Sequence, residues 1–161
     1  MAIDGAIPVT FEDLFPHGAF ASGEVTPVKD WDLSTAEKTV QQEVQVLAES
    51  GELVKLPVWQ VTVHDGDEDA RETLLVWVVA DRQPVLPERV FGKFRPVELV
   101  GLAVEPFVNR DKCKAPWGGR QHRCGARVAF RYWARALRGA SEAPKPTARA
   151  SAGAGNGRAE Q

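Results

Sequence analysis

Arginine and tryptophan side chains alternate in the last third of the sequence, from Arg127 to Arg135. If this segment is a β-strand, alternate residues share a face, because successive side chains of a strand point to opposite sides. Guanidinium groups bind phosphates and an indole ring stacks on a base, so the arginine face is typical of a surface that binds single-stranded nucleic acid. Its residues are Arg127, Ala129, Arg131, Trp133 and Arg135, and the opposite face carries Val128, Phe130, Tyr132, Ala134 and Ala136.

The same segment permits two other interpretations. Its alanine content also favours a helix over 127–138, on which the arginines would form one stripe. It could also be a solvated edge strand, whose arginines discourage aggregation and are neutralised by acidic residues of the first half of the chain. Strand and helix both present a basic face.

A glycine- and arginine-rich loop over 109–126 precedes this segment and enlarges its positive charge. Such a loop beside a basic strand adds phosphate contacts, and binding of this kind depends strongly on salt. The loop contains Arg110, Lys112, Lys114, Arg120 and Arg123 around Trp117. We predict a nucleic-acid-binding surface formed by Trp117, Arg120, Arg123, Arg127, Arg131, Trp133 and Arg135.

Two cysteines and one histidine lie within this loop, at Cys113, His122 and Cys124. A structural zinc site usually has four ligands, so His17 or His64 would have to complete a site here from a distance. A disulfide between the cysteines is chemically possible but is disfavoured in a reducing cytosol. Two free thiols are the third possibility, and we expect neither a bound metal nor another cofactor.

Charge is divided unevenly along the chain. Residues 1–109 contain 8 Lys and Arg against 19 Asp and Glu, a net charge of −11, whereas residues 110–161 contain 12 against 3, a net charge of +9. Such segregation is typical of contact with a polyanion or an acidic partner. Part of the basic excess lies in residues 139–161, whose Ala, Ser, Gly and Pro composition predicts a disordered tail.

Short strands with frequent turns must position these groups. The length fits a single domain, and alternating or continuous apolar runs predict strands over 18–29, 56–64, 73–80, 96–108 and 127–137. Residues 35–50 read either as a helix, because Ser34 and Glu37 have capping-box spacing, or as an irregular hairpin closing at 50–52. We predict a mainly β (or α+β) fold, a small five- to six-stranded OB-like barrel or sandwich with at most one short helix. Residues 18–138 would form this domain, after an N-terminal lead-in over 1–17.

Several functional classes lack their signatures. The sequence contains no nucleophile elbow, Walker motif, dinucleotide fingerprint or His-Glu-x-x-His, so we expect a protein that is not an enzyme. The acidic stretch after His64 reads as a solvated turn. No apolar run approaches the roughly 18 residues of a membrane helix, and the N-terminus lacks the features of a secretory signal. We therefore expect a cytoplasmic location and no membrane partner.

Several short motifs together carry a resemblance to a known family. The main motifs are Phe15-Pro16-His17-Gly18, Leu56-Pro57-Val58-Trp59-Gln60-Val61, Ala80-Asp81-Arg82-Gln83-Pro84 and Phe94-Arg95-Pro96-Val97-Glu98. In their order and spacing, residues 3–138 resemble the small actinobacterial proteins identified as plasmid replication, integration and excision activators. The resemblance implies a regulatory protein that switches a mobile element from its integrated state to excision and replication. It implies no set of catalytic or DNA-contacting residues.

Three functional hypotheses follow. The first is an activator that binds DNA through the basic strand and loop. The second is a protein–protein adaptor whose acidic body binds a replication or excision protein. The third is a small zinc-stabilised domain. The sequence does not choose an oligomeric state for any of them.

Overall fold

The computed structural model describes residues 5–67, 69–70, 73–114 and 124–140. These residues are mostly β-structure with one short helix, which confirms the predicted fold class. The elements are β1 (Ile7–Pro8), α1 (Phe11–Leu14), β2 (Ala19–Pro27), β3 (Glu43–Leu47), β4 (Leu53–Asp65), β5 (Thr73–Val79), β6 (Arg95–Val100), β7 (Ala103–Asn109), β8 (Arg127–Ala134) and β9 (Ala136–Gly139).

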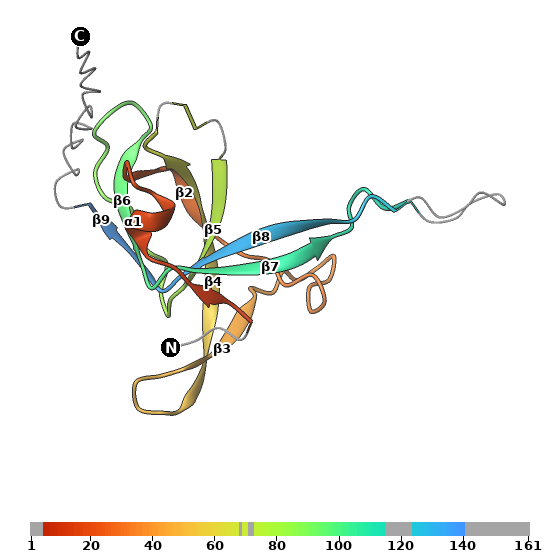
Figure 1. The fold of residues 1–161 in the computed structure, drawn as a ribbon. Coiled ribbons are helices and arrows are strands. Elements are labelled where there is room, and N and C mark those ends of the chain that lie inside the picture. Colours follow the sequence, from red (N-terminus) through yellow and green to blue (C-terminus); the bar gives the residue numbers. More distant parts are fainter. Residues whose placement is uncertain (1–4, 68, 71–72, 115–123, 141–161) are drawn as a thin grey trace, which may run out of the picture.

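The strands form one strongly curled sheet (Figure 1). Neighbouring strands follow the order β1-β7-β8-β5-β4-β2-β6-β9, and β3 pairs with β4 beside this path. The pairing of β5 with β8 is parallel, and the other strand pairs are antiparallel.

The strand pairs β6–β9 and β7–β8 belong to one long hairpin, residues 95–109 paired with 127–139. Val100 pairs with Ala136 and Ala103 pairs with Trp133, so two residues lie between the two pairs on both strands and the register is unchanged. Between them the backbone N–H of Arg135 donates to the carbonyl of Val100 at 2.8 Å. The hairpin bends at Gly101, where φ is 63° and a Cβ would lie 2.4 Å from Cδ of Arg135. Only glycine fits this bend without displacing the arginine.

The long hairpin closes a ring of strand pairings. β2 pairs with β4, β4 with β5, β5 with β8, and β9, which continues β8, pairs with β6. β6 returns to β2 through the pairing of Arg95–Val97 with Ala19–Ala21. Counting each strand of the long hairpin once, five strands form the ring, with β1 and β3 attached outside it. This curled, barrel-like sheet agrees with the barrel alternative of the predicted fold, and not with the sandwich.

Alternate residues of the five ring strands fill the barrel. The side chains at these positions are buried, and the aromatic ring of Phe15 joins them from the segment after α1. The interior residues are Phe15, Ala19, Ala21, Val25, Val61, Val63, Val76, Val78, Val97, Leu99, Leu102 and Ala134. A second cluster on the outer surface of the barrel consists of Val28, Val46, Val58, Val79 and Trp133.

Residues 43–65 form a hairpin, so the helix considered for 35–50 is wrong and the hairpin alternative is correct. Val44 and Val46 pair with Leu56 and Val54, and Val46 is fully buried in the outer cluster. The hydroxyl of Ser34 does not cap a helix; it accepts from the backbone N–H of Val40 at 2.9 Å within a loop. Pairing with the long β4 strand thus prevails over the local capping signal.

Both ends of the predicted domain differ in detail from the observed elements. Residues 7–15 contribute β1, α1 and the buried Phe15, so part of the predicted lead-in packs against the barrel. β9 extends to Gly139, and the predicted tail lies outside the described residues from residue 141 onward. Within the described part of the chain, no helix is long and apolar enough to cross a membrane.

Replacing Phe15 tests whether the segment before β2 belongs to the core. Phe15 is 2% exposed, so Phe15→Ala should lower the free energy of unfolding by about 3–5 kcal/mol, measured by urea denaturation. The matched control is Phe91→Ala, since Phe91 is 78% exposed and its truncation should change stability by less than about 0.5 kcal/mol. Equal effects of the two substitutions would contradict this packing.

Candidate nucleic-acid interface

The long hairpin runs beyond the barrel as a two-stranded arm (Figure 1). β1 pairs with β7 at Ala103–Val104 and β5 pairs with β8 at Tyr132–Ala134. Farther out, within the described residues, β7 and β8 pair only with each other, as far as Asn109 opposite Arg127. We call residues 105–114 and 124–131 the arm. The barrel therefore holds the predicted basic segment at one end and projects the other end into solvent.

The predicted alternation of arginine and tryptophan is present, because 127–134 is a strand. β8 pairs with β7 over seven residues, so the helix considered for 127–138 is wrong. Arg127, Arg131 and Trp133 share one face of β8, as their spacing predicts. The residues opposite them in β7 are Asn109, Glu105 and Ala103.

Trp133 is not available to stack on a base. Its side chain is 3% exposed, and its indole Nε1 donates to Oε2 of Glu105 at 2.8 Å. The ring of Trp77, beside it on β5, meets it edge to face with centroids 5.0 Å apart. The prediction of Trp133 as a nucleic-acid-stacking residue is therefore wrong, because the parallel β5–β8 pairing covers its ring.

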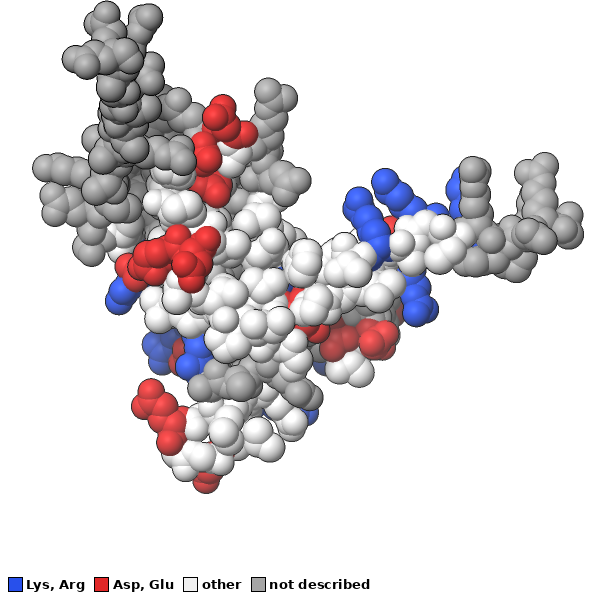
Figure 2. Space-filling model, in the orientation of Figure 1, with Lys and Arg blue, Asp and Glu red and all other residues white. Residues whose placement is uncertain are grey.

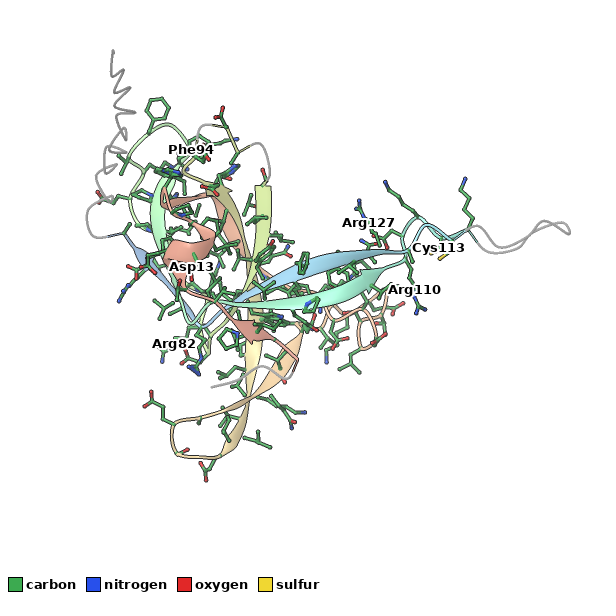
Figure 3. The ribbon with its side chains drawn as sticks, viewed as in Figure 1. Asp13, Arg82, Phe94, Arg110, Cys113 and Arg127 are labelled. Carbon is green, nitrogen blue, oxygen red and sulfur yellow. The ribbon has the colours of Figure 1, made fainter. Side chains whose placement is uncertain are left out.

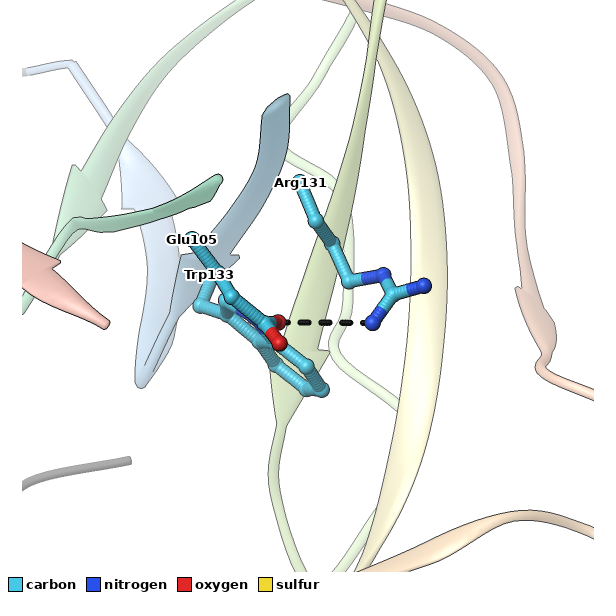
Figure 4. Close-up of polar contacts among 3 residues, drawn as sticks. All are labelled: Glu105, Arg131 and Trp133. Carbon is cyan, nitrogen blue, oxygen red and sulfur yellow. Dashed lines mark hydrogen bonds and ion pairs between the residues drawn. The ribbon is translucent and has the colours of Figure 1, made fainter. Parts of the chain in front are cut away.

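Arg131 is also engaged within the protein. Its Nη1 donates to the same Glu105 oxygen at 3.3 Å, so one carboxylate binds both Arg131 and Trp133 (Figure 4). Its guanidinium carbon lies 4.3 Å from the ring centre of Trp77 and 5.0 Å from that of Phe107. About 31% of the Arg131 side chain remains exposed, which leaves part of it open to a ligand. Its predicted phosphate contact is thereby weakened by an internal partner.

Arg135 lies at the bend and not on the arm. Its side chain packs against Gly101, and it lines a shallow hollow together with Leu56, Asp81 and Leu137. Its Nε is buried, and the described residues offer that atom no hydrogen-bond partner. The structure therefore separates Arg135 from the tip of the arm, contrary to the predicted common surface.

Exposed cations gather toward the end of the arm (Figures 2 and 3). Arg110, Lys112, Lys114 and Arg127 are exposed, and among the described residues none of them forms an ion pair. The nearest acidic residue in the sequence is Asp111, so the described tip keeps a net positive charge. Of the predicted site, this end retains Arg127, whereas Trp117, Arg120 and Arg123 lie outside the described residues.

The opposite face of the arm is apolar and exposed. Val108 is 55% exposed, Val128 66% and Phe130 55%, and Val108 pairs directly with Val128. Inside the barrel, alternate residues of this same face are buried, as at Ala134. Sequence alternation had placed Val128 and Phe130 together on the face opposite the arginines. The length of the arm beyond β5 is what leaves them uncovered.

The two cysteines lie near the described end of the arm, before and after residues 115–123 in the sequence. Sγ of Cys113 is 3.8 Å from Sγ of Cys124, which is longer than a disulfide bond. His122, the third candidate metal ligand, lies outside the described residues. Within the described ranges, no group of three His, Cys, Asp or Glu side chains could hold a metal ion.

One side-chain contact on the barrel wall, between a serine and a histidine, was not predicted from the sequence. Ser22 Oγ and His64 Nε2 are 2.6 Å apart, and the Ser22 side chain is buried. Burial, followed by the charge of Lys93, lowers the pKa of His64. Neutral imidazole therefore prevails near pH 7 and satisfies the buried hydroxyl. A hollow of about 450 Å³ beside it is lined mainly by Phe20, Phe91, Phe94 and the turn 65–67.

Substitution of Glu105 tests the shared carboxylate. Glu105→Ala should cost about 1–3 kcal/mol of stability, because it leaves the buried indole N–H of Trp133 without an acceptor. Glu105→Gln keeps an acceptor oxygen and loses only the partly exposed ion pair with Arg131, so it should cost less than about 1 kcal/mol. Urea denaturation followed by tryptophan fluorescence measures both. If the two variants were equally destabilised, the indole bond would not be the larger contribution.

Comparison with known proteins gives no indication of function, so the proposal below depends on the arm and its side chains. No protein-family model, no curated protein and no solved structure matches this chain.

Proposed function

We propose that this protein is a non-enzymatic accessory or activator protein that binds DNA through the tip of its arm. The observation that carries the proposal is a set of exposed cations at the end of a projecting β-ribbon that form no ion pair with any described residue: Arg110, Lys112, Lys114 and Arg127. The resemblance to plasmid replication, integration and excision activators supplies the setting, a cytoplasmic protein of an integrative mobile element. No cofactor takes part in this function.

The shape of the arm suits a nucleic-acid groove or backbone. A two-stranded β-ribbon fits the major groove of B-DNA, and cations on its end neutralise phosphates and release condensed counterions. The pairing between β7 and β8 keeps the strands in fixed register up to Asn109 and Arg127, so the cations of both strands lie at the same end of the arm. In this view most acidic side chains lie on the barrel and one group lies below the arm, whereas basic side chains predominate toward the tip (Figure 2). A polyanion at the tip would therefore meet less repulsion than at the barrel.

A salt titration tests this proposal. Fluorescence anisotropy with single- and double-stranded DNA should give a dissociation constant that rises with salt. In Arg110→Gln combined with Arg127→Gln, binding should weaken, and the slope of log K against log salt should become shallower by about 1.4–1.8, because two phosphate contacts are lost.

The matched control removes the same charge from the body. Arg82 and Arg89 are exposed in the segment between β5 and β6, and Arg82 lies far from the tip (Figure 3). Arg82→Gln combined with Arg89→Gln should leave the slope unchanged. No binding at low salt, or equal losses in both double variants, would refute the arm as the DNA contact.

The exposed apolar face of the arm favours a second candidate function, a protein–protein adaptor. Val108, Val128 and Phe130 present exposed apolar side chains on a two-stranded segment whose outer edges pair with no other described strand, which is suited to a replication or excision protein. Burial of Trp133 and the internal pairing of Arg131 also favour this candidate, since they reduce the nucleic-acid-binding capacity of β8.

Phe130→Ser separates the two candidate functions. For the adaptor, a pull-down from nuclease-treated lysate of the host should lose its specific partner with Phe130→Ser and keep it with Phe91→Ser, an exposed phenylalanine on the barrel. For the DNA-binding protein, Phe130→Ser should change the dissociation constant for DNA less than the double arginine variant does. A partner retained by Phe130→Ser would eliminate the apolar face as its binding site.

A further inference from the structure

The thiols of Cys113 and Cys124 face each other across the arm where its two strands end. Their sulfurs are 3.8 Å apart, Cys113 is half-buried and Cys124 is exposed (Figure 3). A disulfide bond is about 2.0 Å long, so the sulfurs have to approach by about 1.8 Å. Side-chain rotation can supply a movement of this size when the backbones are already close.

The backbone holds the two cysteines in this position. Asn109 and Arg127 form the last pair of the ladder, and the N–H of Cys113 donates to the carbonyl of Arg110 at 2.8 Å in the turn that follows. Next to Cys124, a Cβ on Gly125 would lie 2.7 Å from the carbonyl oxygen of Lys112. The chains therefore touch at this level, and the proximity of the sulfurs follows from main-chain packing.

We propose that Cys113 and Cys124 are a reversible redox-modification site, which a low-molecular-weight disulfide oxidises to an intramolecular disulfide. The bond would close the ten residues 114–123 into a covalent ring at the tip of the arm. The ring contains Lys114, Arg120 and Arg123, so the modification acts on the most basic part of the chain. Its regulatory consequence rests on the proposed DNA-binding function, whereas the modification itself does not.

The chemistry balances with oxidised glutathione as the oxidant. The exposed Cys124, as thiolate, attacks one glutathione sulfur, which forms a mixed disulfide and releases the first glutathione thiolate. The Cys113 thiolate then attacks Sγ of Cys124, breaks the mixed disulfide and releases the second. Two protein thiols lose two electrons and two protons, and one glutathione disulfide gains them. Oxidised glutathione is an anion, so the cations at the tip favour its approach.

The disulfide fixes the ends of the two strands to each other, beside the exposed Lys112, Lys114 and Arg127, before DNA is bound. Pre-organised cations lose less conformational entropy on binding, so we expect the oxidised protein to bind DNA about three- to tenfold more tightly than the reduced protein. The reduced state returns on addition of excess glutathione or dithiothreitol.

Peptide mapping tests the modification. The full chain is incubated with oxidised glutathione, alkylated and digested with trypsin without reduction. The expected product is the peptide Cys113–Lys114 joined to the peptide Cys124–Arg127, in a protein whose intact mass has fallen by about 2 Da. Stable glutathione adducts, disulfides between two chains, unchanged thiols or a stoichiometric bound zinc ion that protects the thiols would each overturn the proposal.

DNA affinity tests the consequence. Anisotropy in oxidised and reduced buffer should show the three- to tenfold difference for the natural chain and none for Cys113→Ser combined with Cys124→Ser. A linked peptide with unchanged DNA affinity would overturn the regulatory role. Absence of DNA binding in both states would refute the proposed function while the linked peptide still established the modification site. The two failures are therefore distinguishable.

Discussion

One continuous run of backbone hydrogen bonding, between residues 95–109 and 127–139, supports both the barrel and the arm. The register does not change at the bend, where Gly101 leaves room for Arg135. A slip of one residue would turn every buried side chain of β8 toward solvent, exchanging the places of Trp133 and Arg131 with those of their neighbours. Packing of Ala134 inside the barrel and of Trp133 outside it therefore also determines which side chains the tip presents.

Electrostatic compensation differs along the long hairpin. Near the barrel, Glu105 binds Arg131 and Glu98 binds Arg138 across the β6–β9 ladder. The hydrogen bond from Arg138 lowers the pKa of Glu98, so this carboxylate stays ionised further into the acidic range. At the tip, the described cations lack such partners. Among the described residues, the basic excess seen in the sequence is therefore concentrated at the end of the arm. There a phosphate would compete with water and counterions for the cationic side chains.

Local patterns predicted several strands and their faces, but they left strand and helix open at 35–50 and at 127–138. Alternation along 56–64 and 127–134 correctly separated Val61 and Val63 from their neighbours, because a side chain's direction in a strand depends on its own backbone. The burial and hydrogen bonding of Trp133 depend on Trp77 and Glu105. These two residues come from other strands, and no local sequence pattern connects them to Trp133. The hairpin at 43–65 likewise depends on β4 being long enough to pair with β3 beyond the barrel. Contacts between distant segments, such as that of Ser22 with His64, form only when the strands that carry them pair in the sheet.

The parallel pairing of β5 with β8 also constrains when this protein can fold. The ring of strands closes only after residues 127–139 are available, because they supply the pairings with both β5 and β6. Until then β5 has an open edge and the valines of the interior face solvent on one side. On a ribosome, where a chain grows by about 5–20 residues each second, the earlier strands wait several seconds for their last partner. Topologies dominated by such distant pairings fold slowly. Chaperones that bind extended apolar segments would thus meet this chain before its barrel exists.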